Sequence, residues 1–201
     1  MTFHLSTRFI AVAKTLLDIV GFPATPSRME DAALVIVDAQ NEYLSGNLRL
    51  EGIEAAVGEI KRLLLEARAL KSPVFHVVHH GWAGSPIFAP AGPYVEVIQD
   101  LEPEAGEAIV VKTLPNSFAK TDLQEKIRKT GRTELIIVGF MTHMCVSTTV
   151  RAALDLGYKS TVFAKATATR DLPNPLGGII KASELQAAAL AALADRFAAI
   201  V

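Results

Sequence analysis

Short runs of β-branched and other apolar residues alternate along this chain with longer runs whose apolar residues recur at helical spacing. The first run, AALVIV at residues 32–37, is continuously apolar, which is typical of a strand buried on both faces of a sheet. A helical pattern over residues 54–70 follows it. Because strand–helix–strand crossovers join parallel strands, this alternation predicts a three-layer α/β/α, Rossmann-like fold with a mainly parallel sheet.

The same two patterns predict the other elements of the fold. Further strands are expected at residues 74–78, 108–111, 135–138 and 160–163. Further helices are expected at residues 119–129, 143–156 and 183–197, the last with Ser183 as its N-cap.

Two regions fall outside this alternation. Residues 79–107 form a long connection, with a short helix expected at 94–100, and loops of this length usually bind ligands or contact other subunits. At the N-terminus, residues 1–29 are expected to form an amphipathic helix at 7–20 and a connector. The catalytic or binding domain is then expected at residues 30–201.

Composition limits the partners and the compartment of the chain. Its 201 residues include one cysteine, and 20 Lys and Arg against 21 Asp and Glu give a formal net charge of −1. One cysteine excludes an intrachain disulfide and favours a reducing, cytoplasmic compartment. The balanced charge disfavours a nucleic-acid partner. Residues 72–95 lack charged side chains, but their prolines and glycines exclude a membrane-spanning helix, so no membrane partner is expected.

Three reactive side chains lie at the ends of predicted strands: Asp38, Lys112 and Cys145, the last at the start of a predicted helix. The carboxyl ends of parallel strands share one edge of a sheet, where ligands of such folds bind. A thiol at a helix N-terminus beside an ammonium is favoured to ionise, and a carboxylate can take its proton and return it to a leaving group. Each residue alone has a simpler interpretation, as a small buried side chain, a turn cap or a surface charge. Their joint placement favours an activated cysteine nucleophile.

The residues around these three positions resemble one known family. Val-Asp-x-Gln at 37–40, Val-Lys at 111–112 with Ser-Phe at 117–118, and Gly-x-x-Thr-x-x-Cys-Val at 139–146 occur in the order seen in the isochorismatase-like cysteine hydrolases. The resemblance runs from about residue 32 to the C-terminus. It is specific for the family and uninformative about the substrate.

This resemblance implies roles for several residues. Asp38 is expected as the general base, Lys112 as the positioning and charge-stabilising group, and Cys145 as the nucleophile. A cis peptide bond is expected at Phe140–Met141, and the backbone N–H groups of Met141 and Cys145 are expected to form an oxyanion hole. Residues expected around the substrate pocket are Gln40, Tyr43, Trp82, Asn116, Phe118, Phe140 and Thr142.

The implied function is hydrolysis of a C–N bond, in a small amide or ureide, through a thioester on the cysteine. Two alternatives stay open: an isochorismatase-type vinyl-ether hydrolase, which needs no cysteine, and a non-catalytic binding or assembly protein that keeps the scaffold. A homo-oligomer, either a dimer or a tetramer, is expected because relatives commonly form one. A dinucleotide-binding role is disfavoured because no G-x-G-x-x-G motif follows the first strand.

Histidines after the second strand raise the question of a metal. Nicotinamidases of this family carry a metal-binding Asp-x-His there, whereas this chain has His76, His79 and His80 with no Asp, which disfavours nicotinamidase activity. His76 and His79 point to opposite faces if the chain is extended, so we expect no metal and no other cofactor. Lys165 occupies a place where relatives often have an acidic residue, and we attach no function to it.

Overall fold

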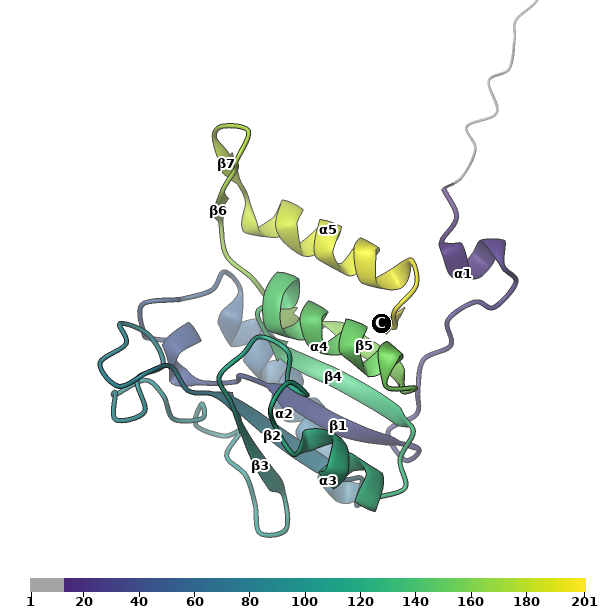
Figure 1. Ribbon diagram of the computed structural model, residues 1–201, viewed down its shortest axis with the longest axis horizontal. Helices are drawn as coiled ribbons and strands as arrows, with labels where there is room; N and C mark the ends of the chain where they lie inside the picture. Colours follow the sequence, from purple (N-terminus) through teal and green to yellow (C-terminus); the bar gives the residue numbers. More distant parts are fainter. Residues whose placement is uncertain (1–12) are drawn as a thin grey trace, which may run out of the picture.

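A parallel six-stranded sheet forms the centre of the computed structural model, which describes residues 13–201 (Figure 1). The strands lie in the order β3-β2-β1-β4-β5-β8, and every pairing between them is parallel. Their bounds are Ala32–Val37 for β1, Val74–His79 for β2, Ala108–Lys112 for β3, Glu134–Phe140 for β4, Lys159–Ala168 for β5 and Ala199–Ile200 for β8. The predicted parallel sheet is therefore confirmed.

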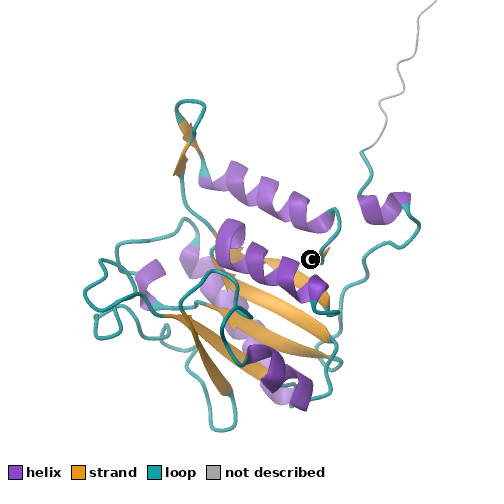
Figure 2. Cartoon of the chain, viewed as in Figure 1, coloured by secondary structure: helices purple, strands orange, loops and turns teal. Residues whose placement is uncertain are grey.

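Helices cover both faces of this sheet, which completes the three layers (Figure 2). One face carries α2 (Ile53–Ala69), and the other carries α3 (Leu123–Lys129), α4 (Ser147–Asp155) and α5 (Ala182–Ala194). The remaining elements are short: α1 (Leu16–Ile19), η1 (Asn41–Tyr43), η2 (Thr142–Val146), and a separate antiparallel hairpin of β6 (Leu172–Pro173) and β7 (Ile179–Ile180).

Strand β1 shows why its sequence is continuously apolar. Leu34 and Ile36 belong to the core beneath α2, whereas Val35 and Val37 belong to the core beneath α3 and α4. All six residues of the strand are buried. A strand in the middle of a covered sheet has no solvent face, so the alternation of polar and apolar residues is lost.

The segment predicted as a helix at 94–100 is not helical. Its backbone pairs instead with the chain after β1: Asn41 N–H donates to Glu96 O, Glu42 N–H to Tyr94 O, and Ile98 N–H to Ala39 O. Those carbonyls and N–H groups are consequently unavailable for helical hydrogen bonds. The long connection is held across the carboxyl end of β1 by these contacts.

Two predicted helix starts are also wrong. The last helix begins at Ala182, not after Ser183, because Asp171 Oδ1 accepts the Ala182 N–H at 2.8 Å. The helix predicted from residue 119 begins at Leu123, because Lys120 has φ +59°, a left-handed conformation that a helix cannot include.

The N-terminal region is only partly described. Of the helix predicted at 7–20, residues 7–12 lie outside the described residues, and Leu16–Ile19 form a single helical turn. Its first N–H groups meet the C-cap residue of α5, where Leu16 N–H donates to Asp195 Oδ1 at 2.7 Å. The division of the chain near residue 30 stays a prediction. Among residues 13–201, no helix combines the length and apolar character needed to cross a bilayer.

Candidate active site

Asp38, Lys112 and Cys145 meet at the carboxyl edge of the sheet. Asp38 directly follows β1, Lys112 ends β3, and Cys145 lies in η2, the π-helical turn that follows β4. Lys112 Nζ lies 2.7 Å from Asp38 Oδ2 and 3.4 Å from Cys145 Sγ. Asp38 and Lys112 are almost completely buried, and Cys145 is 5% exposed. The three side chains selected at separate strand ends thus form one buried cluster, which we call the Asp–Lys–Cys cluster.

Burial changes the acid–base properties of this cluster. Burial raises the pKa of Asp38, against the lowering effect of the Lys112 ammonium. Burial and the charge of Asp38 raise the pKa of the Cys145 thiol to about 12, again against Lys112. Desolvation thus opposes the ionisation of the thiol that a neighbouring ammonium favours. The raised pKa makes the Asp38 carboxylate a stronger base than an exposed one.

The turn before Cys145 has the backbone that the resemblance implies. A cis peptide bond lies at Phe140–Met141. Gly139 precedes it with φ +109°, and a Cβ at this position would lie 2.0 Å from the carbonyl oxygen of Val37 on the neighbouring strand. Only glycine allows β1 and β4 to approach so closely here. The assignment of the Met141 and Cys145 N–H groups to an oxyanion hole stays a prediction.

Four of the seven predicted pocket residues are buried near the cluster and already make contacts within the fold. Gln40 holds the end of β2: its Oε1 accepts the His79 N–H at 2.8 Å, and its Nε2 donates to His79 O at 3.0 Å. The Tyr43 ring packs edge-on against the Phe140 ring at 5.7 Å. Thr142 Oγ1 donates to Ala168 O at 3.1 Å.

The other three predicted pocket residues are less buried. Trp82 is 71% exposed and borders a cavity of about 390 Å³, which His79 and Thr113 also line. Phe118 stacks on Tyr158 at 6.0 Å, and Asn116 Oδ1 accepts the Phe118 N–H. Contact of any of the seven residues with a substrate stays a prediction.

The histidines separate as their spacing predicts. His76 faces the α2 side of the sheet, where its Nε2 lies 2.8 Å from Glu107 Oε2. His79 lies on the opposite side, with Nδ1 3.2 Å from Lys112 Nζ. Residues 13–201 contain no group of three His, Cys, Asp or Glu side chains placed to hold a metal ion. The contact of His79 with Lys112 was missed from the sequence, because it depends on the pairing of β2 with β3.

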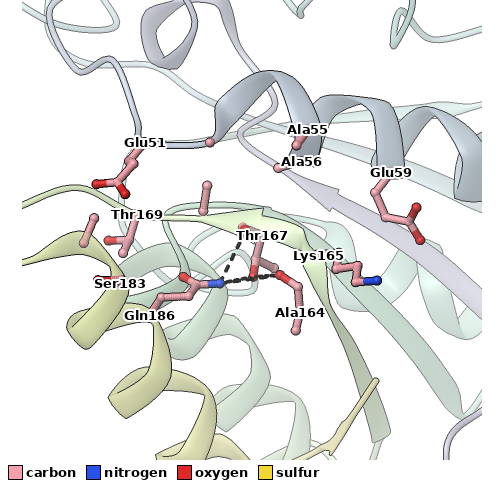
Figure 3. Close-up of a pocket in the computed structure, with 13 residues that line it drawn as sticks. Glu51, Ala55, Ala56, Glu59, Ala164, Lys165, Thr167, Thr169, Ser183 and Gln186 are labelled. Atoms are coloured by element: carbon pink, nitrogen blue, oxygen red, sulfur yellow. Dashed lines mark hydrogen bonds between the residues drawn. The ribbon is translucent and has the colours of Figure 1, made fainter.

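Lys165 lies away from the Asp–Lys–Cys cluster. It is exposed and borders a cavity of about 410 Å³ between α2, α5 and the irregular middle of β5, where Gln186 Nε2 donates to Thr167 Oγ1 at 2.9 Å (Figure 3). No residue of the Asp–Lys–Cys cluster lines this cavity.

Comparisons with known proteins identify the family of the chain. The family model described as Isochorismatase domain matches residues 32–201. A secreted isochorismatase effector of Verticillium dahliae is 40% identical over 182 residues, which cover 90% of this chain and 93% of that protein. The crystal structure of an isochorismatase from Pseudomonas putida is 42% identical, with a TM-score of 0.90 over 94% of this chain and 97% of that one. The chain belongs to the isochorismatase family of hydrolases.

More distant relatives include amidases. A ureidoacrylate amidohydrolase of Variovorax paradoxus is 26% identical over 72% of this chain and 73% of that protein. Others are named streptothricin hydrolase and nicotinamidase. The Verticillium relative is named as secreted, and the cytoplasmic location expected for this chain stays a prediction.

Proposed function

We propose that this chain hydrolyses a C–N bond in a small amide or ureide, with Cys145 as nucleophile, Asp38 as general base and acid, and Lys112 as positioning group. The observation that carries the proposal is the buried Lys112 ammonium, which contacts the Asp38 carboxylate at 2.7 Å and the Cys145 sulfur at 3.4 Å. Burial raises the pKa of Asp38, which makes its carboxylate a stronger base for the proton of the Cys145 thiol than an exposed carboxylate would be.

The first half of the reaction forms a thioester. As the Cys145 sulfur attacks the carbonyl carbon, its proton passes to Asp38 and the carbonyl oxygen becomes an oxyanion. The N–H groups of Met141 and Cys145 are proposed to donate to that oxygen. When the oxyanion collapses, the C–N bond breaks, and Asp38 returns the proton to the leaving ammonia or amine.

The second half releases the acid. Water attacks the thioester carbonyl while Asp38 takes one of its protons. The C–S bond then breaks, and the departing sulfur recovers that proton from Asp38. Lys112 takes no part in the proton transfers of this scheme: whenever Asp38 holds the transferred proton, the negative charge lies on the oxyanion of the tetrahedral intermediate.

One feature separates this proposal from the alternatives. Vinyl-ether hydrolysis proceeds by acid chemistry and has no use for a thiol in contact with a buried ammonium. A binding or assembly protein likewise does not need a buried ion pair against its only cysteine, since burying charged groups costs free energy without a gain in stability.

A turnover screen tests the proposal. Purified protein is incubated with small primary amides, ureides, nicotinamide and isochorismate, and the release of ammonia, amine or pyruvate is measured. We expect at least one amide or ureide to be hydrolysed, with a loss of about 10⁴-fold in Cys145→Ala. Isochorismate cleavage that persists in Cys145→Ala supports the vinyl-ether alternative, and turnover of an amide at the original rate in that variant refutes the proposed nucleophile.

A further inference from the structure

His79 is held directly beside the Asp–Lys–Cys cluster by the sheet itself. It is the last residue of β2 and pairs in register with Lys112, the last residue of β3. The side chains of two residues in register on neighbouring strands stand side by side on one face of the sheet. His79 Nδ1 accordingly lies 3.2 Å from Lys112 Nζ.

The orientation of the His79 ring is fixed from two sides. Both backbone polar groups of His79 bond to the Gln40 amide, at 2.8 and 3.0 Å, so the residue cannot shift along the strand. Its ring meets the Phe88 ring edge-on with centroids 5.2 Å apart. These contacts hold the backbone of His79 and support its ring on the side of Phe88.

The hydrogen-bonding capacity of Lys112 makes this contact important. An ammonium carries three N–H donors and no acceptor. Three acceptors surround Lys112 Nζ: Asp38 Oδ2 at 2.7 Å, His79 Nδ1 at 3.2 Å and Cys145 Sγ at 3.4 Å. Lys112 thus forms a buried ion pair with Asp38 and makes hydrogen bonds with His79 Nδ1 and Cys145 Sγ. His79 is the only one of the three that has no part in the proposed chemistry.

His79 can accept this hydrogen bond only while its ring is unprotonated. Burial, followed by the charge of Lys112 and by His80, lowers the pKa of His79 to about 4. The titratable groups that face it are Lys112 on β3 and the adjacent His80, with Asp38 and Cys145 beyond Lys112. The ring is consequently neutral at pH 7, with its remaining proton on Nε2.

We propose that His79 is a positioning residue of the cluster: its Nδ1 accepts a hydrogen bond from Lys112 and so holds the ammonium between Asp38 and Cys145. The role rests on the proposed function, because the cluster it positions is the proposed catalytic one. Without this acceptor, one donor of Lys112 loses its partner. The ammonium is then held by Asp38 and Cys145 alone, and its position relative to the sulfur is no longer fixed.

An isosteric pair of variants separates hydrogen bonding from packing. His79→Asn keeps an acceptor close to the position of Nδ1, whereas His79→Leu has a similar shape and no acceptor. The readout is the rate at which iodoacetamide alkylates Cys145, measured from pH 5 to 10, because this is the only cysteine of the chain. His80→Leu is the matched control, since its side chain makes no hydrogen bond within residues 13–201.

We expect His79→Leu to slow alkylation about tenfold throughout pH 5 to 10, because the pKa of the thiol, already above this range, rises further when the thiolate loses its fixed counter-charge. His79→Asn should stay within about threefold of the parent, and His80→Leu within about twofold. Parent-like alkylation of His79→Leu overturns the proposal. Equal slowing in His79→Asn and His79→Leu overturns it as well, because the acceptor is then irrelevant.

A measurement on the unaltered protein covers the case in which His79→Leu does not fold. The ¹⁵N shifts of the His79 ring, assigned with His79→Asn, report which nitrogen carries the proton. We expect the Nε2–H tautomer from pH 5 to 8, and the Nδ1–H tautomer contradicts the proposal. Neither assay uses a substrate. Failure of the turnover screen with the expected alkylation and tautomer therefore counts against the proposed reaction and not against the role of His79.

Discussion

At the scale of single residues, Lys112 is the most constrained side chain of the site. It is 1% exposed, and Asp38 is the carboxylate within contact distance of its ammonium. Breaking a buried ion pair by removing one partner is costly, because the other charge stays buried without compensation. Removing both charges costs much less.

This difference gives a prediction about stability. We expect Asp38→Asn to lower the free energy of unfolding by about 3 kcal/mol. The double variant Asp38→Asn with Lys112→Met should lose clearly less than the single variant. Urea denaturation followed by circular dichroism measures both. Additive losses in the double variant would contradict the assignment of Asp38 and Lys112 as a coupled buried pair.

A second residue-scale prediction concerns pH. Burial raises the pKa of Glu107, but hydrogen bonds from Arg68, the Glu104 N–H and His76 outweigh it, and the pKa lies at about 2. A carboxyl whose pKa is lower in the folded than in the unfolded state contributes stability above its unfolded pKa and loses it as the pH falls. We therefore expect the stability from Glu107 to be complete above about pH 5 and to be lost between about pH 4.5 and 2.

The variant Glu107→Gln tests this contribution. It should lower the free energy of unfolding at pH 7 by about 2 kcal/mol, reduced from the full value of the pKa shift for partial exposure, and should flatten the loss of stability below pH 5. Exposed Glu102 on the same loop supplies the control, Glu102→Gln, which should leave the acid unfolding curve unchanged. An unchanged acid curve in Glu107→Gln is the result that contradicts the prediction.

At the scale of elements, replacing glycine by alanine is expected to have opposite effects on stability at two positions. A Cβ at Gly139 in β4 would lie 2.0 Å from Val37 O, and its φ is +109°. A Cβ at Gly58 inside α2 would meet nothing within 4 Å. We expect Gly139→Ala to destabilise by about 3 kcal/mol or more, and Gly58→Ala to stabilise by about 0.5–1 kcal/mol. Thermal unfolding of the two variants measures both effects. A Gly139→Ala variant as stable as the parent would contradict the close approach of β1 and β4.

The strands were predictable from the sequence because each contains a short apolar, β-branched run, which is continuous in β1. Residues 32–37 were placed correctly at both ends, since burial on both faces leaves no other pattern. The helix expected at 94–100 failed because its backbone pairs with the chain after β1, a contact between segments far apart in sequence. The contact of His79 with Lys112 was missed for the same reason. The sequence shows which reactive residues lie at strand ends. It does not show which of them become neighbours, because that depends on the order and register of the strands.

At the scale of the whole molecule, apolar surface remains exposed at the edge of the sheet. Ile109 and Val111 on the edge strand β3 are 55% and 49% exposed. Apolar residues on an edge strand are a liability for an isolated chain and are typical of surfaces that other chains cover. They support the expectation of a homo-oligomer without identifying its interface.

Light scattering coupled to size-exclusion chromatography tests this expectation. We expect a dimer or tetramer of the 21.5 kDa chain at micromolar concentration. Dilution series at two salt concentrations serve as the control for weak association. A monomer throughout the micromolar range would contradict a homo-oligomer.

The central claim, that the cysteine held by Lys112 and Asp38 forms a covalent acyl intermediate, is tested most directly by intact-protein mass spectrometry. Protein is mixed with an amide or ureide that it hydrolyses and is quenched with acid within the first turnovers. We expect an added mass equal to the acyl group, located on the peptide that contains Cys145 and absent in Cys145→Ala. Hydrolysis of the same substrate with no adduct at any quench time, and with full turnover in Cys145→Ala, would contradict the claim.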